Sequence, residues 1–139
     1  IGVSGSRISS IADIMADVIL EEQTKKEFDI DMIAGLTNNG IPLATIVSEI
    51  LGVDFGMVRT SREGTETNYA SNYAGIESKN VILIDDVISS GSTMKEAIKF
   101  VQEQGGTTVL IMVLINKRGE DELDSVPLRA LIRARPVKI

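Results

Sequence analysis

The chain contains no cysteine and no histidine, and these two absences exclude much chemistry. Without cysteine there are no disulfides and no thiolate nucleophile, which fits a reducing compartment. Without histidine, imidazole metal sites and histidine-based acid or base catalysis are excluded. Aromatic residues make up only 4% of the chain, so Ile, Val, Leu, Ala and Met must fill the core.

The sequence also lacks an excess of basic residues and any long apolar run. Its formal net charge is -6, which argues against a non-specific nucleic-acid binder. No apolar run approaches the roughly 18 residues of a membrane span, and no signal-peptide pattern appears. We therefore predict a cytoplasmic protein with no membrane partner and no nucleic-acid contact through this domain.

The length of the chain fits one domain. Its 139 residues are enough for a single hydrophobic core, and no internal repeat or low-complexity segment divides them. Because the chain begins with Ile1 rather than Met, we expect residues 1–139 to be one domain that lacks an upstream segment.

Apolar periodicity predicts strands that alternate with helices. A helix is expected over residues 9–22, with Ser9 or Ser10 as its N-cap. The polar stretch 60–79 shows no sustained period, which is typical of a functional or mobile connection. The other helices are expected over residues 41–51 and 92–104, and the strands over residues 31–36, 54–59, 80–85, 107–115 and 128–134.

This alternation indicates an α/β fold with a mostly parallel twisted sheet and helices on both faces. In such sheets ligands bind outside the carboxyl ends of the strands. Three connecting segments are expected at that edge, over residues 36–40, 60–75 and 85–93.

The last of these segments belongs to the most informative stretch, "VILIDDVISSGST" from Val81 to Thr93. Two adjacent carboxylates, Asp85 and Asp86, repel each other and lose hydration unless a hydroxyl-rich ligand or Mg²⁺ compensates them. The small hydroxyl residues that follow lead into a helix, whose N-terminus attracts anions. A sugar diol beside a phosphate satisfies both halves, so the spacing suits a ribose 5-phosphate. The predicted phosphate-binding residues are Ser89, Ser90, Gly91, Ser92 and Thr93.

The same stretch has three rival interpretations. Serines before a helix also occur as a simple N-cap, although the adjoining Asp pair weakens that interpretation. A glycine-rich nucleotide loop needs GxxxxGK[ST] or GxGxxG, and neither occurs. A phospho-acceptor receiver domain carries its acidic pair after the first strand, whereas here the pair closes the third strand and the fourth ends in Asn116.

"VILIDDVISSGST" resembles the signature of type I phosphoribosyltransferases at each of its thirteen positions. That family binds phosphoribosyl pyrophosphate (PRPP) together with Mg²⁺. The resemblance implies that Asp85 and Asp86 bind the ribose hydroxyls and that residues 89–93 hold the 5′-phosphate. It also implies that Mg²⁺ is bound mainly through PRPP, with the two aspartates as further candidate ligands.

A second segment, "GLTNNGIPLA" from Gly35 to Ala44, resembles the family's pyrophosphate loop and in particular the "GIPLA" ending of its orotate branch. Taken alone, an Asn-Gly pair is more typical of an ordinary strand-to-helix turn. Beside the matched PRPP motif, the resemblance implies a pyrophosphate loop made of Thr37, Asn38, Asn39 and Gly40.

Residues 59–75 occupy the position of the family's flexible catalytic loop, which closes over PRPP. In orotate phosphoribosyltransferases this loop reads approximately Arg-Lys-x-x-Lys-x-His-Gly, and a lysine assists the departure of pyrophosphate. The resemblance implies Arg59 and Arg62 as catalytic residues here, but the segment has no lysine and no histidine. We expect Arg62 to meet the leaving pyrophosphate as a fixed cation.

The orotate branch carries Asp-Arg after its fourth strand, where the arginine holds the carboxylate of the base. The matching pair here is Asn116 and Lys117, with Arg118 next. Lys117 and Arg118 are therefore candidates for binding an anionic base, and a solvated turn is the alternative. Little or none of the family's base-covering hood is expected, since only "ARPVKI" follows the last strand.

Across roughly residues 1–135 the chain most resembles archaeal orotate phosphoribosyltransferase-like proteins, in which the domain follows an N-terminal helix-turn-helix. One hypothesis is an enzyme that transfers phosphoribosyl from PRPP to a nucleobase such as orotate, in pyrimidine biosynthesis, with release of pyrophosphate. Another is a non-catalytic ligand-sensing domain of a transcription regulator, which binds PRPP, a nucleotide or a sugar phosphate and reaches DNA through an upstream domain. A third is a dimeric scaffold with a vestigial site. The resemblance also implies a homodimer.

Overall fold

The structure is a computed structural model that describes residues 5–36, 38–60, 68–70 and 75–134. Three helices and seven strands are formed by these residues. In chain order they are α1 (Gly5–Lys26), β1 (Met32–Leu36), α2 (Gly40–Leu51), β2 (Asp54–Arg59), β3 (Asn68–Ala70), β4 (Asn80–Ile88), α3 (Ser92–Glu103), β5 (Thr107–Asn116), β6 (Glu122–Leu123) and β7 (Val126–Arg133).

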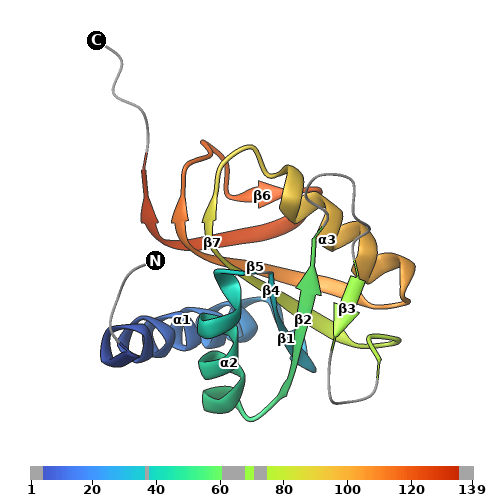
Figure 1. Ribbon diagram of the computed structural model, residues 1–139, viewed down its shortest axis with the longest axis horizontal. Coiled ribbons are helices and arrows are strands. Elements are labelled where there is room, and N and C mark those ends of the chain that lie inside the picture. The colour runs from blue at the N-terminus through green and yellow to red at the C-terminus, as the bar shows by residue number, and fades with distance from the viewer. Residues whose placement is uncertain (1–4, 37, 61–67, 71–74, 135–139) are drawn as a thin grey trace.

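The strands form one sheet in the order β3-β2-β1-β4-β5-β7-β6 (Figure 1). The five central strands run parallel, and only the two short outer strands, β3 and β6, pair antiparallel with their neighbours. β4 therefore lies in the middle of the sheet, where apolar residues are covered on both faces. This position explains the unbroken apolar run that leads to the aspartates.

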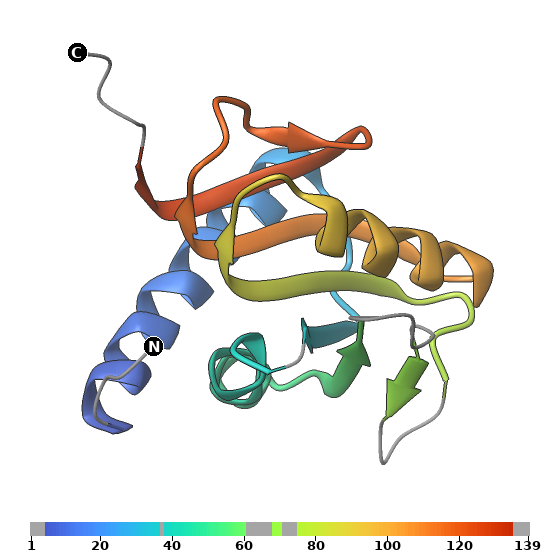
Figure 2. The same ribbon diagram turned by 45° about the horizontal axis from the view of Figure 1, so that its top comes forward.

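Helices cover both faces of the sheet. Along β4 the side chains alternate between the faces, so that Val81 and Leu83 pack with α3 while Ile82 and Ile84 pack with α1 and α2. Figure 2 shows α3 lying across one face and α1 on the other side of the sheet. The prediction of a mostly parallel α/β fold with helices on both faces is confirmed.

Most predicted elements match the structure closely. The strand expected over residues 54–59 is β2, and the strand expected over residues 31–36 is β1 without its first residue. The helix expected to end before Gly52 is α2, and Gly52 adopts a left-handed conformation at its C-cap. These elements have uninterrupted periodicity, which explains why the pattern located their ends.

Several predicted boundaries were wrong, and two short strands were missed. α1 begins at Gly5, so Ser9 and Ser10 lie inside the helix and neither is its N-cap. β4 continues to Ile88 because it pairs with β5 beyond the aspartates. The polar stretch 60–79 contains β3, and the connection between the strands expected over residues 107–115 and 128–134 contains β6. Both are short edge strands formed by pairing with a neighbour, which leaves little periodic signal in the sequence.

Among the residues that the structure describes, no helix is both long and apolar enough to cross a membrane.

Candidate functional site

The acidic pair lies near the end of β4, beyond the described pairing of this strand with β1. Among the described residues, β4 pairs with β1 as far as Ile84 and with β5 as far as Ile88. Asp85 and Asp86 are half-buried, and each carboxylate accepts a hydrogen bond of 2.8 Å from the backbone N–H of the next residue, Asp86 and Val87 respectively. The aspartates are thus held on the strand at the carboxyl edge of the sheet, as the sequence predicted.

The small hydroxyl residues that follow form a compact turn into α3. Gly91 is the residue before the helix, with φ of 85°, and its carbonyl accepts the first helical hydrogen bond from Lys95 N–H at 2.9 Å. A left-handed φ strains any residue with a Cβ, which explains the glycine. Ser90 Oγ lies 3.1 Å from Ser92 Oγ and accepts a 3.3 Å hydrogen bond from Ser92 N–H. A hydroxyl of the loop therefore occupies a donor that an anion at a helix N-terminus would use.

Gly40 brings a second connection against the acidic pair. A Cβ on Gly40 would lie 2.3 Å from the carbonyl oxygen of Ile84 and 3.0 Å from Cα of Asp85. The first turn of α2 therefore contacts the backbone of β4 directly, and only glycine allows that approach. Asn39, the residue before this helix, makes no side-chain capping hydrogen bond to it. Its side chain is exposed beside the acidic pair.

These parts enclose one pocket with a volume of about 310 Å³. Its lining combines the residue before α2, the end of β4 and the turn into α3. The residues are Asn39, Asp85, Asp86, Val87, Ile88, Ser89, Ser90, Gly91, Ser92, Thr93 and Met94. Two of the three segments predicted at the carboxyl edge therefore meet here.

The pocket has two chemically distinct ends. The carboxylates of Asp85 and Asp86 are hydrogen-bond acceptors suited to hydroxyl groups. The opposite end offers hydroxyls, backbone N–H groups and the positive end of the α3 dipole, which suit an anion. A small molecule with a diol at one end and a phosphate at the other matches both.

The pocket also fits a metal ion whose ligands would come partly from the protein and partly from a bound phosphate compound and water. Among the described residues, no group of three or more Asp, Glu, His or Cys side chains lies close enough together to hold a metal ion. Asp85 and Asp86 offer carboxylate oxygens, the ligand type that Mg²⁺ prefers. Because Mg²⁺ commonly takes most of its ligands from water and phosphates, two carboxylates are a suitable protein contribution.

Four other predicted site residues, Arg59, Asn38, Arg62 and Thr37, do not line the pocket or lie outside the described residues. Arg59 ends β2 with an exposed side chain and is not a lining residue of the pocket. Asn38 is exposed in the turn before α2, where its carbonyl accepts a 3.4 Å hydrogen bond from Ile41 N–H. Arg62 and Thr37 lie outside the described residues.

The two candidate base-binding residues lie behind the turn into α3. Lys117 is exposed, and its backbone N–H donates to the Ile88 carbonyl at 2.9 Å. Arg118 directs its guanidinium to the turn itself, where Nη1 donates to the Ser90 carbonyl at 2.6 Å. Neither residue lines the pocket.

Asn116 has a structural role in this region that its place at a strand end did not predict. It is only 1% exposed. Its Oδ1 accepts from Arg118 N–H at 2.7 Å, and its Nδ2 donates to the Glu120 carbonyl at 3.0 Å. The available signal was an asparagine at a strand end before a glycine-containing turn, a position where Asn side chains often replace backbone partners.

The chain is similar to known proteins in sequence and in fold. A family model for the phosphoribosyl transferase domain matches residues 5–131. The transcriptional regulator GfcR of Thermoplasma acidophilum is 43% identical over 137 residues, which cover 99% of this chain and 69% of that protein.

Two solved structures share the fold. Adenine phosphoribosyltransferase from Thermoanaerobacter pseudethanolicus has a TM-score of 0.70 at 21% identity, covering 88% of this chain and 79% of its own. Orotate phosphoribosyltransferase from Aeropyrum pernix has a TM-score of 0.69 at 24% identity, covering 87% of this chain and 70% of its own. At these identities the likeness concerns the fold alone.

Proposed function

The chain belongs to the phosphoribosyl transferase domain family, and from this premise we propose that it is the ligand-sensing domain of a transcription regulator. Its ligand is PRPP or a related phosphoribosyl compound. The predicted membership of the family is confirmed by the match over residues 5–131. The regulatory role was the second hypothesis from the sequence, and the name of the 43% identical relative from Thermoplasma acidophilum now favours it over the enzyme.

The observation that carries the binding part of the proposal is the two-ended pocket. Asp85 and Asp86 would accept hydrogen bonds from the ribose hydroxyls of the ligand. The turn from Ser89 to Thr93 would hold its 5′-phosphate, which would replace Ser90 Oγ at the N–H of Ser92. The volume of about 310 Å³ lies at the small end of the range for ligand pockets, in keeping with a sugar phosphate.

Mg²⁺ is expected to accompany PRPP rather than to reside in the protein. Asp85 and Asp86 would contribute carboxylate oxygens, and the diphosphate of the ligand would provide others. When bound, the ion would neutralise part of the ligand's negative charge beside two carboxylates. This matters for a chain whose formal net charge is -6.

The sensing part of the proposal rests on the segment that follows β2. Residues 59–75 contain no lysine and no histidine, although the family's orotate enzymes use both residue types there. A site that retains ligand contacts without these groups is suited to binding and conformational response. DNA binding would then lie in the part of the regulator beyond this chain. We place such a regulator in the cytoplasm.

Phosphoribosyl transfer is the second candidate function. It is favoured by the pocket, whose acidic pair and anion-binding turn are the parts that an enzyme of this family needs to hold PRPP. The reaction would form a bond between the C1 carbon of the ribose and a nitrogen of the base, and it would break the bond between that carbon and pyrophosphate, which leaves. Charge stabilisation and positioning would provide most of the rate enhancement.

One measurement tests both candidates, and a second separates them. Isothermal titration calorimetry with PRPP and Mg²⁺ should show saturable binding of one ligand per chain, and its absence with PRPP, nucleoside monophosphates and ribose 5-phosphate would contradict both. A pyrophosphate-release assay with PRPP and orotate, adenine, guanine or uracil should show no turnover if the domain is a sensor. Turnover with any base would establish the enzyme instead.

We also propose a homodimer, the assembly expected of this family. Multi-angle light scattering at micromolar concentration should give twice the mass of the chain, with and without ligand. A monomeric mass under both conditions would contradict the assembly without bearing on the pocket.

A further inference from the structure

We propose that Arg118 is a positioning residue that holds the anion-binding turn in its ligand-ready shape, and that it is not a ligand of an anionic base. This inference rests on the proposed binding function and assigns the residue on which phosphate recognition depends. The first observation is the 2.6 Å hydrogen bond from Arg118 Nη1 to the carbonyl oxygen of Ser90, between residues 28 positions apart in the sequence. Ser90 belongs to the anion-binding turn, which consists of residues Ser89 to Thr93.

Arg118 contacts Gly91 of this turn as well as Ser90. A Cβ built on Gly91 would lie 2.9 Å from Arg118 Nη1, which means that the guanidinium packs directly against the backbone before α3. The Arg118 side chain is only 16% exposed. A planar guanidinium in this position fixes the direction of the Ser90 carbonyl, and with it the direction of the N–H groups that follow.

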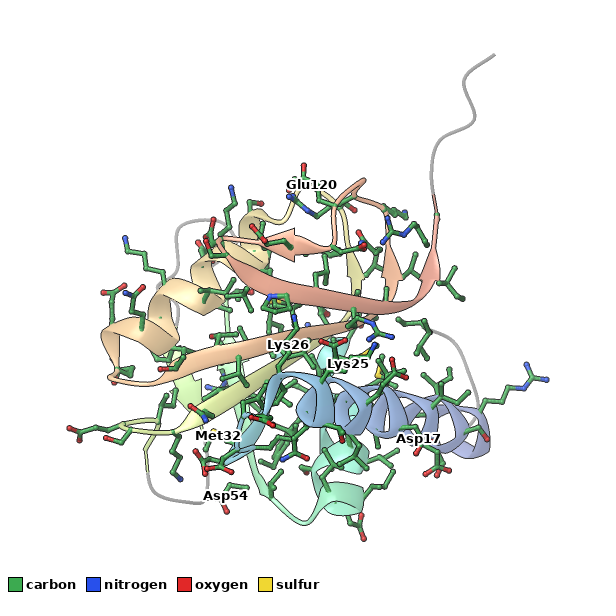
Figure 3. All side chains as sticks on the ribbon, turned by 180° about the vertical axis from the view of Figure 1, so that it is seen from behind. Asp17, Lys25, Lys26, Met32, Asp54 and Glu120 are labelled. Atoms are coloured by element: carbon green, nitrogen blue, oxygen red, sulfur yellow. The ribbon has the colours of Figure 1, made fainter. Side chains whose placement is uncertain are left out.

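The connection after β5 holds Arg118 in place. Asn116 is buried, and its side chain binds both Arg118 N–H and the Glu120 carbonyl. Glu120 in turn accepts a 3.2 Å hydrogen bond from Arg118 Nη2. Figures 1 and 2 both show the connection from β5 to β6 beside the turn from β4 to α3, and Glu120 is labelled in Figure 3. These hydrogen bonds together hold the Arg118 side chain against the backbone of the anion-binding turn.

The charge of Arg118 is only partly balanced. Its carboxylate partner Glu120 is 72% exposed, so water screens that ion pair strongly. In the described part of the chain, Arg118 Nε is buried and has no hydrogen-bond partner. A buried unsatisfied donor is destabilising, so this arrangement is not optimised for stability alone. It does place positive potential directly behind the turn that would receive a phosphate.

Arg118 cannot easily serve a base at the same time. Its two Nη atoms already donate to Ser90 and Glu120, and Arg118 does not line the pocket. A base-binding role would require the guanidinium to leave the turn. The positioning role therefore implies that loss of Arg118 weakens all phosphate ligands alike, whatever base they carry.

Calorimetry with three ligands tests this prediction. The ligands are ribose 5-phosphate, uridine 5′-monophosphate and orotidine 5′-monophosphate, which share a phosphate but differ in the base and its carboxylate. Arg118→Met should weaken all three by about tenfold, the loss expected for one charge-assisted hydrogen bond. A loss confined to orotidine 5′-monophosphate would show that Arg118 binds the base. Unchanged affinity for all three would overturn the positioning role.

Arg129→Met is the matched control. Arg129 is a half-buried arginine of β7 that pairs with Glu21 and Glu22 of α1, and it is not a lining residue of the binding pocket. Its replacement removes the same side chain from a cluster with α1 and not from the connection that holds Arg118, and it should leave the three affinities within about twofold. Arg118→Lys keeps the charge and one donor, so it should recover part of the lost affinity. No recovery with a folded lysine variant would overturn the role assigned to the hydrogen bond from residue 118 to Ser90.

A ligand-free measurement separates failure of this inference from failure of the proposed function. Amide hydrogen exchange of residues 89–93, followed by NMR, should be about tenfold faster in Arg118→Met than in the wild type, because the turn opens more readily. Arg129→Met should not change these rates. If the wild type binds none of the ligands, the proposed function fails, and unchanged exchange in a folded Arg118→Met variant would overturn the positioning role by itself.

Discussion

The pocket edge of the sheet and the junction between α1 and β7 both gather charged side chains around a half-buried arginine. At the junction, Arg129 of β7 pairs with Glu22, which is only 5% exposed, and with Glu21 at 3.4 Å. Lys26 also lies 3.5 Å from Glu22. Figure 3 shows Lys25 and Lys26 at the end of α1 that lies near β7. Each charge there has an opposite charge beside it.

The pocket edge is organised differently. Arg118 contacts a backbone carbonyl and one exposed carboxylate, and the carboxylate of Asp86 accepts from a backbone N–H. Charges that neutralise each other contribute to attaching a helix, whereas charges bound to the backbone keep their field available for a ligand. The partners of a charged side chain therefore distinguish a structural cluster from a ligand pocket more clearly than its residue type does.

The largest expected effect concerns the pocket edge alone. The double substitution Asp85→Asn and Asp86→Asn should weaken PRPP binding by about 100-fold or more, because two charged acceptors are lost. The fold should survive, because the Oδ1 atoms of the two new asparagines can still accept hydrogen bonds from the backbone N–H groups of residues 86 and 87. Calorimetry measures the affinity, and thermal unfolding measures the stability. Unchanged affinity would remove the ribose-binding role of these carboxylates.

The second effect tests how tightly the pocket edge depends on backbone packing. Gly40→Ala should destabilise the protein by about 2 kcal/mol, because the new Cβ meets the Ile84 carbonyl oxygen at 2.3 Å. Gly75→Ala is the control, since a Cβ there has no neighbour within 4 Å. Urea unfolding gives both free energies. Equal stability of the two variants would mean that α2 moves away from β4 without loss.

The third prediction concerns the junction between α1 and β7, where a substitution should lower stability and leave ligand affinity unchanged. Arg129→Met leaves Glu22 buried with Lys26 as its remaining cation, so the free energy of unfolding should fall by about 1–2 kcal/mol. The affinity for PRPP should not change, because Arg129 lies outside the pocket. A large loss of affinity at constant stability would mean that the junction also controls the site.

The smallest effect lies on the surface of α1. Lys25, whose Nζ donates to Glu21 at 3.1 Å, holds the pKa of that carboxyl below its ordinary value of 4.5, with a smaller contribution from Arg129. A lowered pKa stabilises the folded state above pH 4.5, and this contribution is lost as the pH falls through the folded value. Lys25→Met should therefore slightly reduce stability at pH 7 and make no difference at pH 2. Thermal unfolding at both pH values checks the sign.

Much of the fold was predictable because its central strands and helices carry uninterrupted apolar patterns. The acidic pair and the turn after it were predictable because their chemistry is local, in one stretch from Val81 to Thr93. The extent of β4 was not, since two adjacent aspartates are poor strand residues and only the pairing with β5 keeps them extended. The start of α1 was missed because serines inside a helix resemble an N-cap in the sequence.

The role of Arg118 was the least predictable feature of the site. In the sequence it follows Asn116 and Lys117 in a polar turn, where a charged residue is usually solvated. Its position depends on a buried asparagine and on a carbonyl 28 residues away, so no local pattern reports it. The packing of Gly40 on Ile84 is likewise a contact between segments, although the glycine itself was identified as part of the loop.

The acidic pair belongs to the central strand itself, because the pairing of β4 with β5 continues to Ile88, beyond its described pairing with β1. A ligand in the pocket would therefore contact residues that are hydrogen-bonded into the sheet. Binding would then stabilise the central strands as one cooperative unit, so occupancy of the pocket would change their rigidity.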